Sequence, residues 1–249
     1  MKILEVRHLK KSFVKGGKKI SIIDDINFSV DAGECLGIVG LSGCGKSTTA
    51  RIVAKLLNAD GGEIFFCGEN VTNTTNLKNF YAQVQMIFQT PDDSFDPRKS
   101  LGWSIAEPLK NYGYKGNVAD KVKSLLAEVG LPAEYAERYP HEVSGGECQR
   151  AAIARAISLE PKLLISDEAT SALDADNSFK IVELIKNLCH KKNIACLFIT
   201  HDLALLPKIA DNVLVMDGGK IAERGKPLEI MRQPKSEIAR QMLTANIFE

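Results

Sequence analysis

The chain has 249 residues, of which 45% are hydrophobic and 25% are charged, and its formal net charge is +1. These values are typical of a folded globular protein and exclude a nucleic-acid binder that relies on a basic surface. No apolar run approaches the roughly 18 residues that a membrane-spanning helix needs. The first residues lack the apolar core of a signal peptide, so we expect a cytosolic protein that another chain would anchor at a membrane.

The first 40 residues predict β-structure. The segments ILEVRHL and ISIIDDINFSV alternate or run apolar, and the basic turn KGGKK separates them. The run ECLGIVG at residues 34–40 predicts a buried strand, and helical spacing follows over residues 47–57. A turn and a short strand are predicted next, in NADGGEIFFCGENV.

A phosphate-binding motif lies between that buried strand and the helix. The stretch GLSGCGKST fits the pattern G-x-x-x-x-G-K-[ST], and its glycines let backbone N–H groups face phosphates. Lys46 can reach the β and γ oxygens, and the Ser47 hydroxyl can hold Mg²⁺. A chance match in a chain of this length is expected on the order of one time in a hundred. The predicted nucleotide site consists of Gly40, Leu41, Ser42, Gly43, Cys44, Gly45, Lys46, Ser47 and Thr48.

Strands and helices alternate through the rest of the chain. The runs QVQMIFQ, KLLISDE and IACLFITH predict strands, and residues 92–142 predict a helical insertion. A helix is predicted through residue 158, an amphipathic helix in KIVELIKNLCHKKN, and a hairpin in DNVLVMDGGKIAERG. This alternation predicts an α/β fold with a mostly parallel sheet.

Polar residues follow three of the predicted strands. Asp167 ends KLLISDE, where open α/β sheets bind ligands, and it is the candidate second ligand for Mg²⁺. Glu168 is the candidate general base for an attacking water, and its alternative role is to cap the next turn. His201 can reach a γ-phosphate or orient water, or it can be a polar cap at the sheet edge. Gln89 can contact Mg²⁺ or water.

A second anion-binding site is predicted in VSGGECQR at residues 143–150. This stretch predicts a glycine turn that opens a helix. Such a helix start offers unpaired N–H groups and the positive end of the helix dipole. One small chain therefore carries two predicted sites of this kind.

The motifs GLSGCGKST, FQ, VSGGECQR, LLISDE, SALD and ITHD occur in this order along the chain. Their order and spacing resemble the ATP-binding subunit of ABC transporters over nearly the whole chain. The resemblance implies an ATPase that uses ATP and Mg²⁺, with a P-loop NTPase core of the RecA type, an N-terminal antiparallel β subdomain and an inserted helical subdomain. It implies one domain over residues 1–249, with the core in about 1–91 and 153–249 and the helical subdomain in about 92–152.

The resemblance also accounts for the second anion site. In this family two ATPase domains pair head to tail, so the serine-glycine turn would bind the γ-phosphate held by the opposite subunit. The resemblance implies these roles: Ser144, Gly145 and Gly146 as this signature turn, Glu168 as the catalytic glutamate, His201 as the switch histidine, Gln89 as the Mg²⁺-sensing hinge, Asp174 as the carboxylate of the loop joining the two sites, and Phe13 as the ring that stacks on adenine. The alternative for Phe13 is a core position in the first strand.

Three positions depart from the family pattern. Val143 and Glu147 stand where the family usually has Leu and Gln, and Ala169 replaces a common Pro. Glu147 adds a negative charge near a phosphate site. Because no catalytic group is lost, we expect an active ATPase.

A narrower resemblance covers residues 88–109, FQTPDDSFDPRKSLGWSIAEPL, which are similar to the peptide and nickel importer branch of the family. It implies a second, different ATPase subunit, two transmembrane permeases, an extracellular solute-binding protein and a place at the cytoplasmic face of the cell membrane. Because the chain ends at Glu249 without the long extension of some members, we favour the shorter importers of metal chelates (nickel, cobalt or zinc, as with opine metallophores of the staphylopine type).

Two alternative functions are kept. One is an ABC ATPase of DNA repair or translation, which would carry a coiled-coil insertion or a second fused domain. The other is a regulatory subunit with feeble hydrolysis.

The six cysteines lack C-x-x-C spacing, so we expect reduced thiols. Cys44, beside Lys46 and a helix start, is either a reactive thiol with a lowered pKa or a small residue tolerated in the turn.

Overall fold

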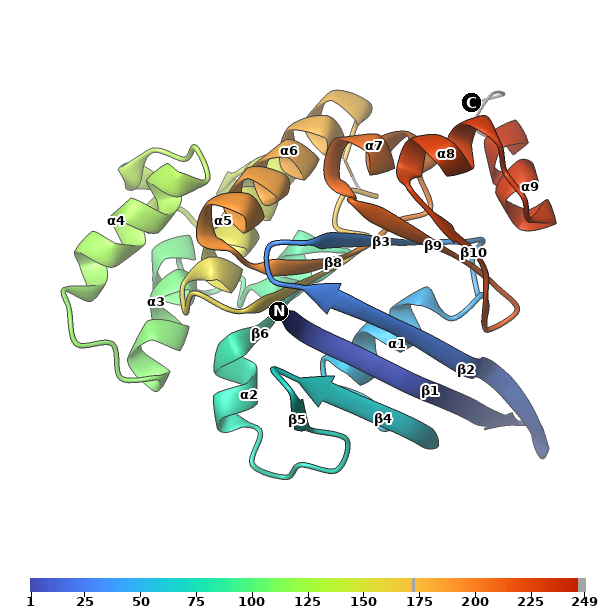
Figure 1. Cartoon of the computed structure of the whole chain (residues 1–249). Helices are drawn as coiled ribbons and strands as arrows, with labels where there is room; N and C mark the ends of the chain where they lie inside the picture. Colours follow the sequence, from blue (N-terminus) through green and yellow to red (C-terminus); the bar gives the residue numbers. More distant parts are fainter. Residues whose placement is uncertain (172, 246–249) are drawn as a thin grey trace.

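Two sheets organise the computed structural model, which describes residues 1–171 and 173–245 (Figure 1). In this part of the chain the first sheet has the strand order β2-β1-β4-β5, and the second has the order β10-β9-β3-β8-β7-β6. The strands are β1 Lys2–Lys15, β2 Lys18–Asp31, β3 Cys35–Val39, β4 Gly61–Phe66, β5 Glu69–Asn70, β6 Val84–Ile87, β7 Leu163–Asp167, β8 Ala195–Ile199, β9 Asn212–Asp217 and β10 Lys220–Gly225.

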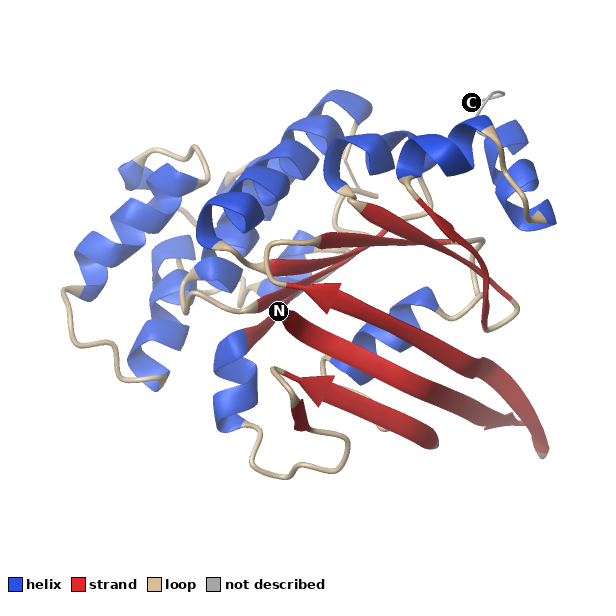
Figure 2. Cartoon of the chain, in the orientation of Figure 1, coloured by secondary structure: helices blue, strands red, loops and turns tan. Residues whose placement is uncertain are grey.

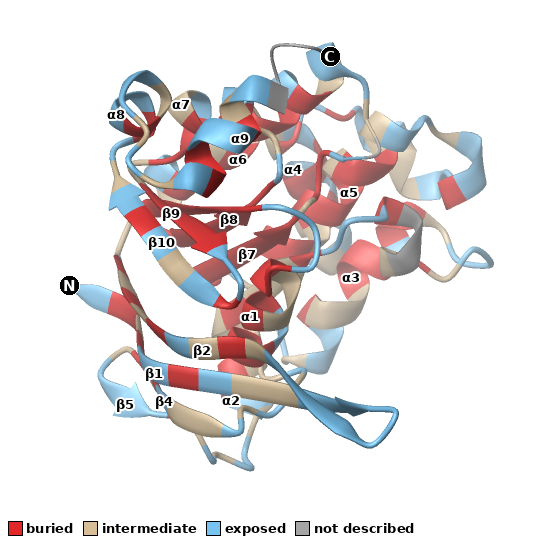
Figure 3. Ribbon diagram, turned by 90° about the vertical axis from the view of Figure 1, so that its right-hand side faces the viewer, coloured by how far each residue is buried: buried red, intermediate tan, exposed pale blue. Residues whose placement is uncertain are grey.

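The second sheet is parallel from β9 to β6, and β10 runs antiparallel along its edge. Its central strands β3, β7 and β8 are buried along their whole length, as expected for short apolar strands covered on both faces. The first sheet is antiparallel, and the tip of its β1–β2 hairpin is exposed (Figure 3). The predicted parallel core sheet and antiparallel N-terminal β part are confirmed.

Helices cover both faces of the second sheet (Figure 2). Helix α1 lies between the two sheets, and its buried residues pack with apolar residues of both. A second core on the opposite face joins α5, α6, α7 and the C-terminal helices to the helical insertion. The helices are α1 Lys46–Val53, α2 Lys78–Gln83, α3 Leu101–Asn111, α4 Val118–Glu128, α5 Gly145–Ile157, α6 Ala175–Lys192, α7 Leu206–Ile209, α8 Pro227–Arg232 and α9 Glu237–Ala245, with 3₁₀ turns η1 Pro91–Ser94, η2 Ala133–Glu137, η3 Pro140–Glu142 and η4 Leu203–Leu205.

Residues 92–152, over which the helical subdomain is predicted, contain α3, α4 and the first part of α5, and α3 and α4 lie at one side of the molecule (Figure 1). The sequence patterns do not predict α2, α8 or α9, which are helices of six to nine residues. Part of the predicted SALD loop, residue 172, and the last part of the predicted domain, residues 246–249, lie outside the described residues. Within the described ranges, no helix has the length and apolar character needed to cross a membrane.

Candidate functional site

Four neighbouring parallel strands bring the predicted polar residues to one edge of the second sheet. In the order β3, β8, β7, β6, these strands all end at that edge. The phosphate loop follows β3, His201 follows β8, and Asp167 ends β7. Gln89 lies in a bend two residues beyond β6, so the predicted strand is shorter than expected at this end. This edge is where ligands bind in open α/β sheets.

The phosphate loop leads directly into α1 without a side-chain cap. Gly45, at the N-cap position, has φ 107°, and a Cβ atom there would lie 2.7 Å from the Ile22 carbonyl oxygen. Only glycine fits this close approach and this backbone conformation. Because no side chain caps the helix, its first N–H groups remain available to an anion.

Lys46 is buried inside its own loop, with 4% of its surface exposed. Its Nζ donates hydrogen bonds to the carbonyl oxygens of Gly40, at 2.8 Å, and Leu41, at 3.1 Å. The same Nζ lies 3.8 Å from Glu168 Oε1. The ammonium group is therefore held at the point where the loop and the end of β7 meet.

A cleft of about 430 Å³ opens beside the loop and collects residues from β1, β2, the loop, the segment after β6 and the end of β7. Phe13 is 42% exposed at this cleft, so its alternative interpretation as a core residue is wrong. The lining consists of Phe13, Ile22, Ser42, Gly43, Gly45, Lys46, Ser47, Thr48, Gln89 and Glu168. Thus a single chain brings together an aromatic ring, the phosphate loop and a carboxylate.

Ser47 and Asp167 form the oxygen pair expected of a magnesium site. Ser47 Oγ donates to Asp167 Oδ1 at 2.8 Å, across the gap between α1 and β7. Burial raises the pKa of the Asp167 carboxyl, which is 6% exposed; the Ser47 hydrogen bond opposes this shift and neighbouring Glu168 adds to it. A hydroxyl and a carboxylate are hard oxygen donors that suit Mg²⁺, so the residues fit this ion.

Glu168 has an unusual backbone. Its φ of 50° lies in the left-handed region, and its N–H donates to the Ile199 carbonyl at 3.0 Å. Oε1 lies 3.8 Å from Lys46 Nζ, and Oε2 lies 3.5 Å from Nδ1 of the exposed His201. Residues held in this region cost energy and are concentrated at functional sites. The two neighbouring carboxylates therefore have different partners: Asp167 accepts from Ser47, whereas Glu168 lies near Lys46 and His201.

The signature turn lies away from this cleft. Ser144 caps α5, and Ser144 and Gly145 are exposed beside the start of α6: a Cβ atom on Gly145 would meet Leu173 at 3.8 Å. Asp174 caps α6 by accepting from the Asn177 backbone at 2.9 Å and from its side chain at 2.8 Å. The predicted residues Ser144, Gly145, Gly146 and Asp174 therefore form a second group, and none of them lines the cleft.

Glu147 belongs to the signature turn as a capping-box residue. Its Oε2 accepts from the Ser144 N–H and the Ser144 hydroxyl, both at 2.8 Å, and its Oε1 accepts from the Tyr135 hydroxyl at 2.5 Å. The Tyr135 bond, followed by the Ser144 bonds, lowers the pKa of the Glu147 carboxyl. The extra negative charge of Glu147 thus stabilises the start of α5, where it accepts hydrogen bonds from Ser144 and Tyr135 and where the helix dipole favours an anion.

Five thiols are buried, and in the described part of the chain Cys67, in the turn after β4, is the one with intermediate exposure. The hypothesis that Cys44 has a lowered pKa is wrong. Burial raises the pKa of its thiol, and the opposing effect of Lys46 is smaller. Cys44 is therefore the small residue that the turn tolerates.

Sequence reasoning missed Ile22, Tyr135, Lys11 and Asp60. Ile22 lies in the cleft because the β1–β2 register pairs Phe13 with Ile20 and leaves Ile22 in a bulge. The two-glycine turn was the available signal for this register. No sequence signal places Tyr135 against Glu147. Lys11 and Asp60 meet at 2.8 Å although 49 residues separate them.

Comparisons with known proteins show the family to which the chain belongs. Residues 23–171 match the family described as ABC transporter. The oligopeptide transport ATP-binding proteins OppF of Bacillus subtilis and Haemophilus influenzae are 42% and 40% identical over 98% of this chain, which covers 82% and 77% of their lengths. The glutathione import ATP-binding protein GsiA of Salmonella paratyphi A is 41% identical over 98% of this chain and 41% of its own length.

Solved structures show the same fold. A dimeric structure of the ATP-binding cassette MJ0796, in a post-hydrolysis state bound to ADP and Pi, superposes with a TM-score of 0.81 at 24% identity. The likeness covers 90% of this chain and 98% of the cassette. With the family match and the close relatives, it leads to one conclusion: the chain belongs to the ABC transporter family and is one of its ATPases.

Proposed function

We propose that this chain is the energy-coupling ATPase of an importer, and that each ATP lies between the cleft of one ATPase subunit and the signature turn of the other. The observation that carries the proposal is the separation of the two groups. The cleft supplies Phe13, the phosphate loop and Glu168, whereas Ser144 and Gly145 are exposed on another part of the surface. A second subunit that presents its signature turn completes the site.

The phosphate end of the site is assigned to the loop and α1. Lys46 would exchange its two carbonyl partners for phosphate oxygens, and the uncapped N–H groups of α1 would bind the same phosphates. Ser47, Asp167 and Gln89 would hold Mg²⁺. When bound, the ion neutralises charge that develops on the phosphates. Phe13 would stack on the adenine ring.

Glu168 is assigned the base role. Its carboxylate lies within 3.8 Å of the Lys46 ammonium and 3.5 Å of the His201 ring, so it would border a terminal phosphate bound by Lys46. From there it can orient a water and accept its proton, while His201 binds the γ-phosphate. Asp174 and the signature turn would join this site from the second subunit.

A contact chain supports coupling between the nucleotide and the helical subdomain. Arg155 on the signature helix α5 donates to the Ser94 carbonyl at 2.9 Å, in the turn that follows Gln89. It also pairs with Glu107 of α3 at 3.3 Å. We propose that this link carries the closure of the site to two permease subunits in the membrane, so that the ATPase works at the cytoplasmic face.

The proposed cargo class is peptides, which are delivered by an extracellular solute-binding protein. The support is the named transport of oligopeptides and glutathione by relatives at 40–42% identity. Metal chelates of nickel, cobalt or zinc are the second candidate, because residues 88–109 are similar to a branch that imports nickel as well as peptides. The second ATPase is proposed to be a related but different chain.

The substitution Glu168→Gln tests the proposed function. We expect kcat for ATP to fall by about 100-fold or more, because the base is lost, while the Kd for ATP changes little. Glu183→Gln, an exposed carboxylate on α6, is the matched control and keeps the wild-type rate. Steady-state hydrolysis, with and without the second ATPase, and equilibrium ATP binding are measured. Normal turnover by Glu168→Gln would remove this residue from the mechanism.

A further inference from the structure

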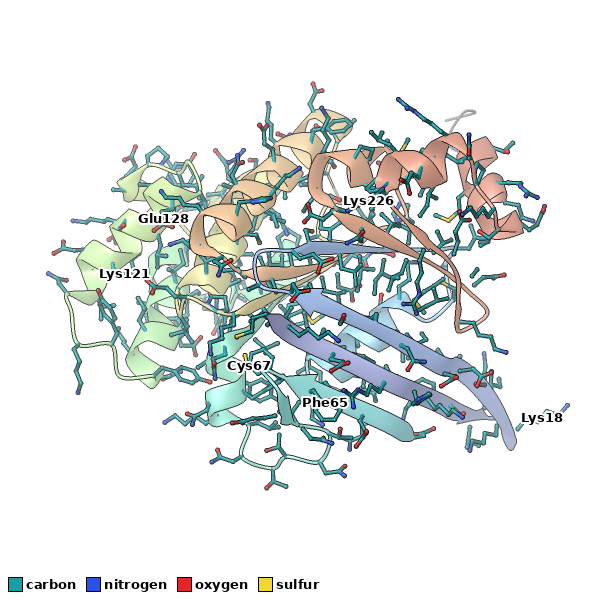
Figure 4. All side chains as sticks on the ribbon, viewed as in Figure 1. Lys18, Phe65, Cys67, Lys121, Glu128 and Lys226 are labelled. Atoms are coloured by element: carbon teal, nitrogen blue, oxygen red, sulfur yellow. The ribbon has the colours of Figure 1, made fainter. Side chains whose placement is uncertain are left out.

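The end of the β1–β2 hairpin that carries Phe13 has little support from the rest of the first sheet. At this end the last β1–β4 pair joins Lys10 to Gly61, so β1 continues beyond β4 paired only with β2. A two-stranded ribbon is marginally stable by itself. The exposed tip of the hairpin, where Lys18 lies, is drawn in Figure 4.

Asp60 attaches this ribbon to the start of β4. Its Oδ1 accepts from Lys11 Nζ at 2.8 Å, and its Oδ2 accepts from the Ser12 backbone N–H at 2.7 Å. Its own N–H donates to the Lys10 carbonyl at 2.9 Å. The Asp60 side chain thus adds one hydrogen bond beyond the last β1–β4 pair. It accepts from the Ser12 N–H, which β4 is too short to reach.

The attachment lies directly beside the ring that borders the cleft. Lys11 and Phe13 point to the same side of β1, and Lys11 Nζ lies 5.3 Å from the centre of the Phe13 ring. Only 12% of the Lys11 side chain is exposed, and its charge is paired with Asp60, so it is poorly placed to bind a phosphate. The Lys11 ammonium is therefore a support for the ring.

Strand β2 is irregular where it passes Lys11 and Ser12 of β1. The β1–β2 register shifts between Lys11 and Ser12, and this bulge leaves Ile22 unpaired in the cleft. The Ile22 carbonyl packs against Gly45 of the phosphate loop. A bulge bends and twists a strand, so the direction of the ribbon depends on what holds it at this point.

We propose that Asp60 is a positioning residue for the nucleotide base: by holding Lys11 and the Ser12 N–H, it fixes the Phe13 ring at the mouth of the cleft. The inference rests on the proposed function, because it takes Phe13 as the stacking platform. It extends that function by assigning base recognition to a β1–β4 contact outside the phosphate motifs. Asp60 bonds Lys10, Lys11 and Ser12 rather than the phosphate loop, which lies between β3 and α1, so we expect phosphate affinity to depend on Asp60 far less than base binding does.

Two ligands separate base binding from phosphate binding. The β,γ-imido analogue of ATP carries the base, and tripolyphosphate lacks it; both are titrated into the full chain with Mg²⁺ by calorimetry. We expect Phe13→Ala to raise the Kd of the analogue about tenfold and Asp60→Ala to raise it about three- to tenfold. The Kd of tripolyphosphate should change less than about twofold for both variants. Asp60→Asn should lose less than Asp60→Ala, because the Asn oxygen still accepts from Ser12.

Control variants make the result specific. Lys11→Met removes the ion pair and leaves Asp60 on Ser12, so it should weaken the analogue like Asp60→Asn. Lys121→Met breaks a comparable pair, Lys121 with Glu160 at 3.0 Å, on α4 at the far side of the molecule (Figure 4), and should change neither ligand. The double variant Phe13→Ala with Asp60→Ala should bind the analogue no more weakly than Phe13→Ala alone.

The outcomes distinguish the inference from the proposed function. If Phe13→Ala weakens the analogue and Asp60→Ala does not, the Asp60 inference fails and the stacking platform stands. Equal losses for analogue and tripolyphosphate in Asp60→Ala also overturn it, since they indicate general damage. If Phe13→Ala leaves both ligands unchanged, the platform itself fails, and the inference fails with it. Thermal melts of each variant show whether the Asp60→Ala chain is folded; if it is not, Asp60→Asn and Lys11→Met decide.

Discussion

Asp167 is subject to two opposing effects of its surroundings. Burial at the end of β7 favours the neutral carboxylic acid, whereas the Ser47 hydroxyl favours the carboxylate. Because the pKa in the folded chain lies above the unfolded value, the folded chain binds the proton more tightly. The contribution of Asp167 to the free energy of unfolding therefore decreases as the pH rises through the folded pKa. A buried carboxylate is thus retained at a cost to stability.

We expect Asp167→Asn to stabilise the chain at pH 7 and to inactivate it. The Asn oxygen can still accept from Ser47, but no charge is buried, so the melting temperature should rise by about 2–4 °C. ATP turnover with Mg²⁺ should fall about 100-fold or more, because the ion loses its carboxylate ligand. Asp176→Asn, on the exposed first turn of α6, is the control and should give no gain. A lower melting temperature for Asp167→Asn would contradict this account.

At the scale of elements, the start of α5 depends on the box between Ser144 and Glu147. The carboxylate accepts from the Ser144 N–H and hydroxyl, and Tyr135 of η2 ties it to the helical subdomain. Because these donors lower the pKa of Glu147 below its usual 4.5, the stabilisation is fully present above that pH. It is lost as the pH falls through the lowered value. The signature turn is therefore held by an ionised side chain.

We predict that Glu147→Gln lowers the melting temperature at pH 7 by about 2–4 °C, the loss expected for a weakened helix cap. The difference from the wild type should shrink below about pH 4.5, where the Glu147 carboxylate of the unfolded chain begins to take up a proton while the folded chain still holds it ionised. Melting curves between pH 3.5 and about 7.5 measure it. Glu183→Gln serves as the exposed control. A difference that stays constant with pH would argue against the ionised box.

Much of this architecture could be predicted from the sequence, because apolar runs and glycine motifs report on local structure. The strand before Gly40, the helix after it and Asp167 at a strand end follow from such patterns. The Ser144–Glu147 box could also be read from S-x-x-E spacing. Contacts between distant segments could not be predicted: Lys11 meets Asp60 only because β1 pairs with β4. Nor does the motif show that the Lys46 ammonium bonds carbonyls of its own loop.

At the scale of the whole molecule, the cleft and the signature turn are separate groups on one chain. The signature turn adjoins the first turn of α6, whereas the cleft lies between α1 and the β1–β2 hairpin. Two chains in a head-to-tail pair would thus form two composite sites. Each site would depend on Lys46 of one chain and Ser144 of the other.

Complementation tests this pairing. Where two copies of this chain pair, the Lys46→Ala and Ser144→Arg chains should each lose about 100-fold or more of their turnover, because neither can build an intact composite site. An equal mixture should recover up to about a quarter of the wild-type rate, since half of the pairs contain one intact site. Where the partner is a different ATPase, Lys46→Ala in this chain and a serine-to-arginine change in the partner's signature turn disable the same composite site, so the doubly substituted pair should turn over ATP no more slowly than either singly substituted pair. A mixture as inactive as its components would refute shared sites.

Because Cys67 is partly exposed, its thiol offers a site for chemical labelling in the native sequence. The other thiols are buried, and Cys67 is labelled in Figure 4. Cys67 follows the end of β4 and Asp60 precedes its start, so a full strand separates Cys67 from the contact beside Phe13. A dye or spin label attached there reports on the antiparallel sheet without an engineered cysteine and without a reagent in the nucleotide cleft. Movements of this sheet during transport thereby become accessible to spectroscopy in the unmodified sequence.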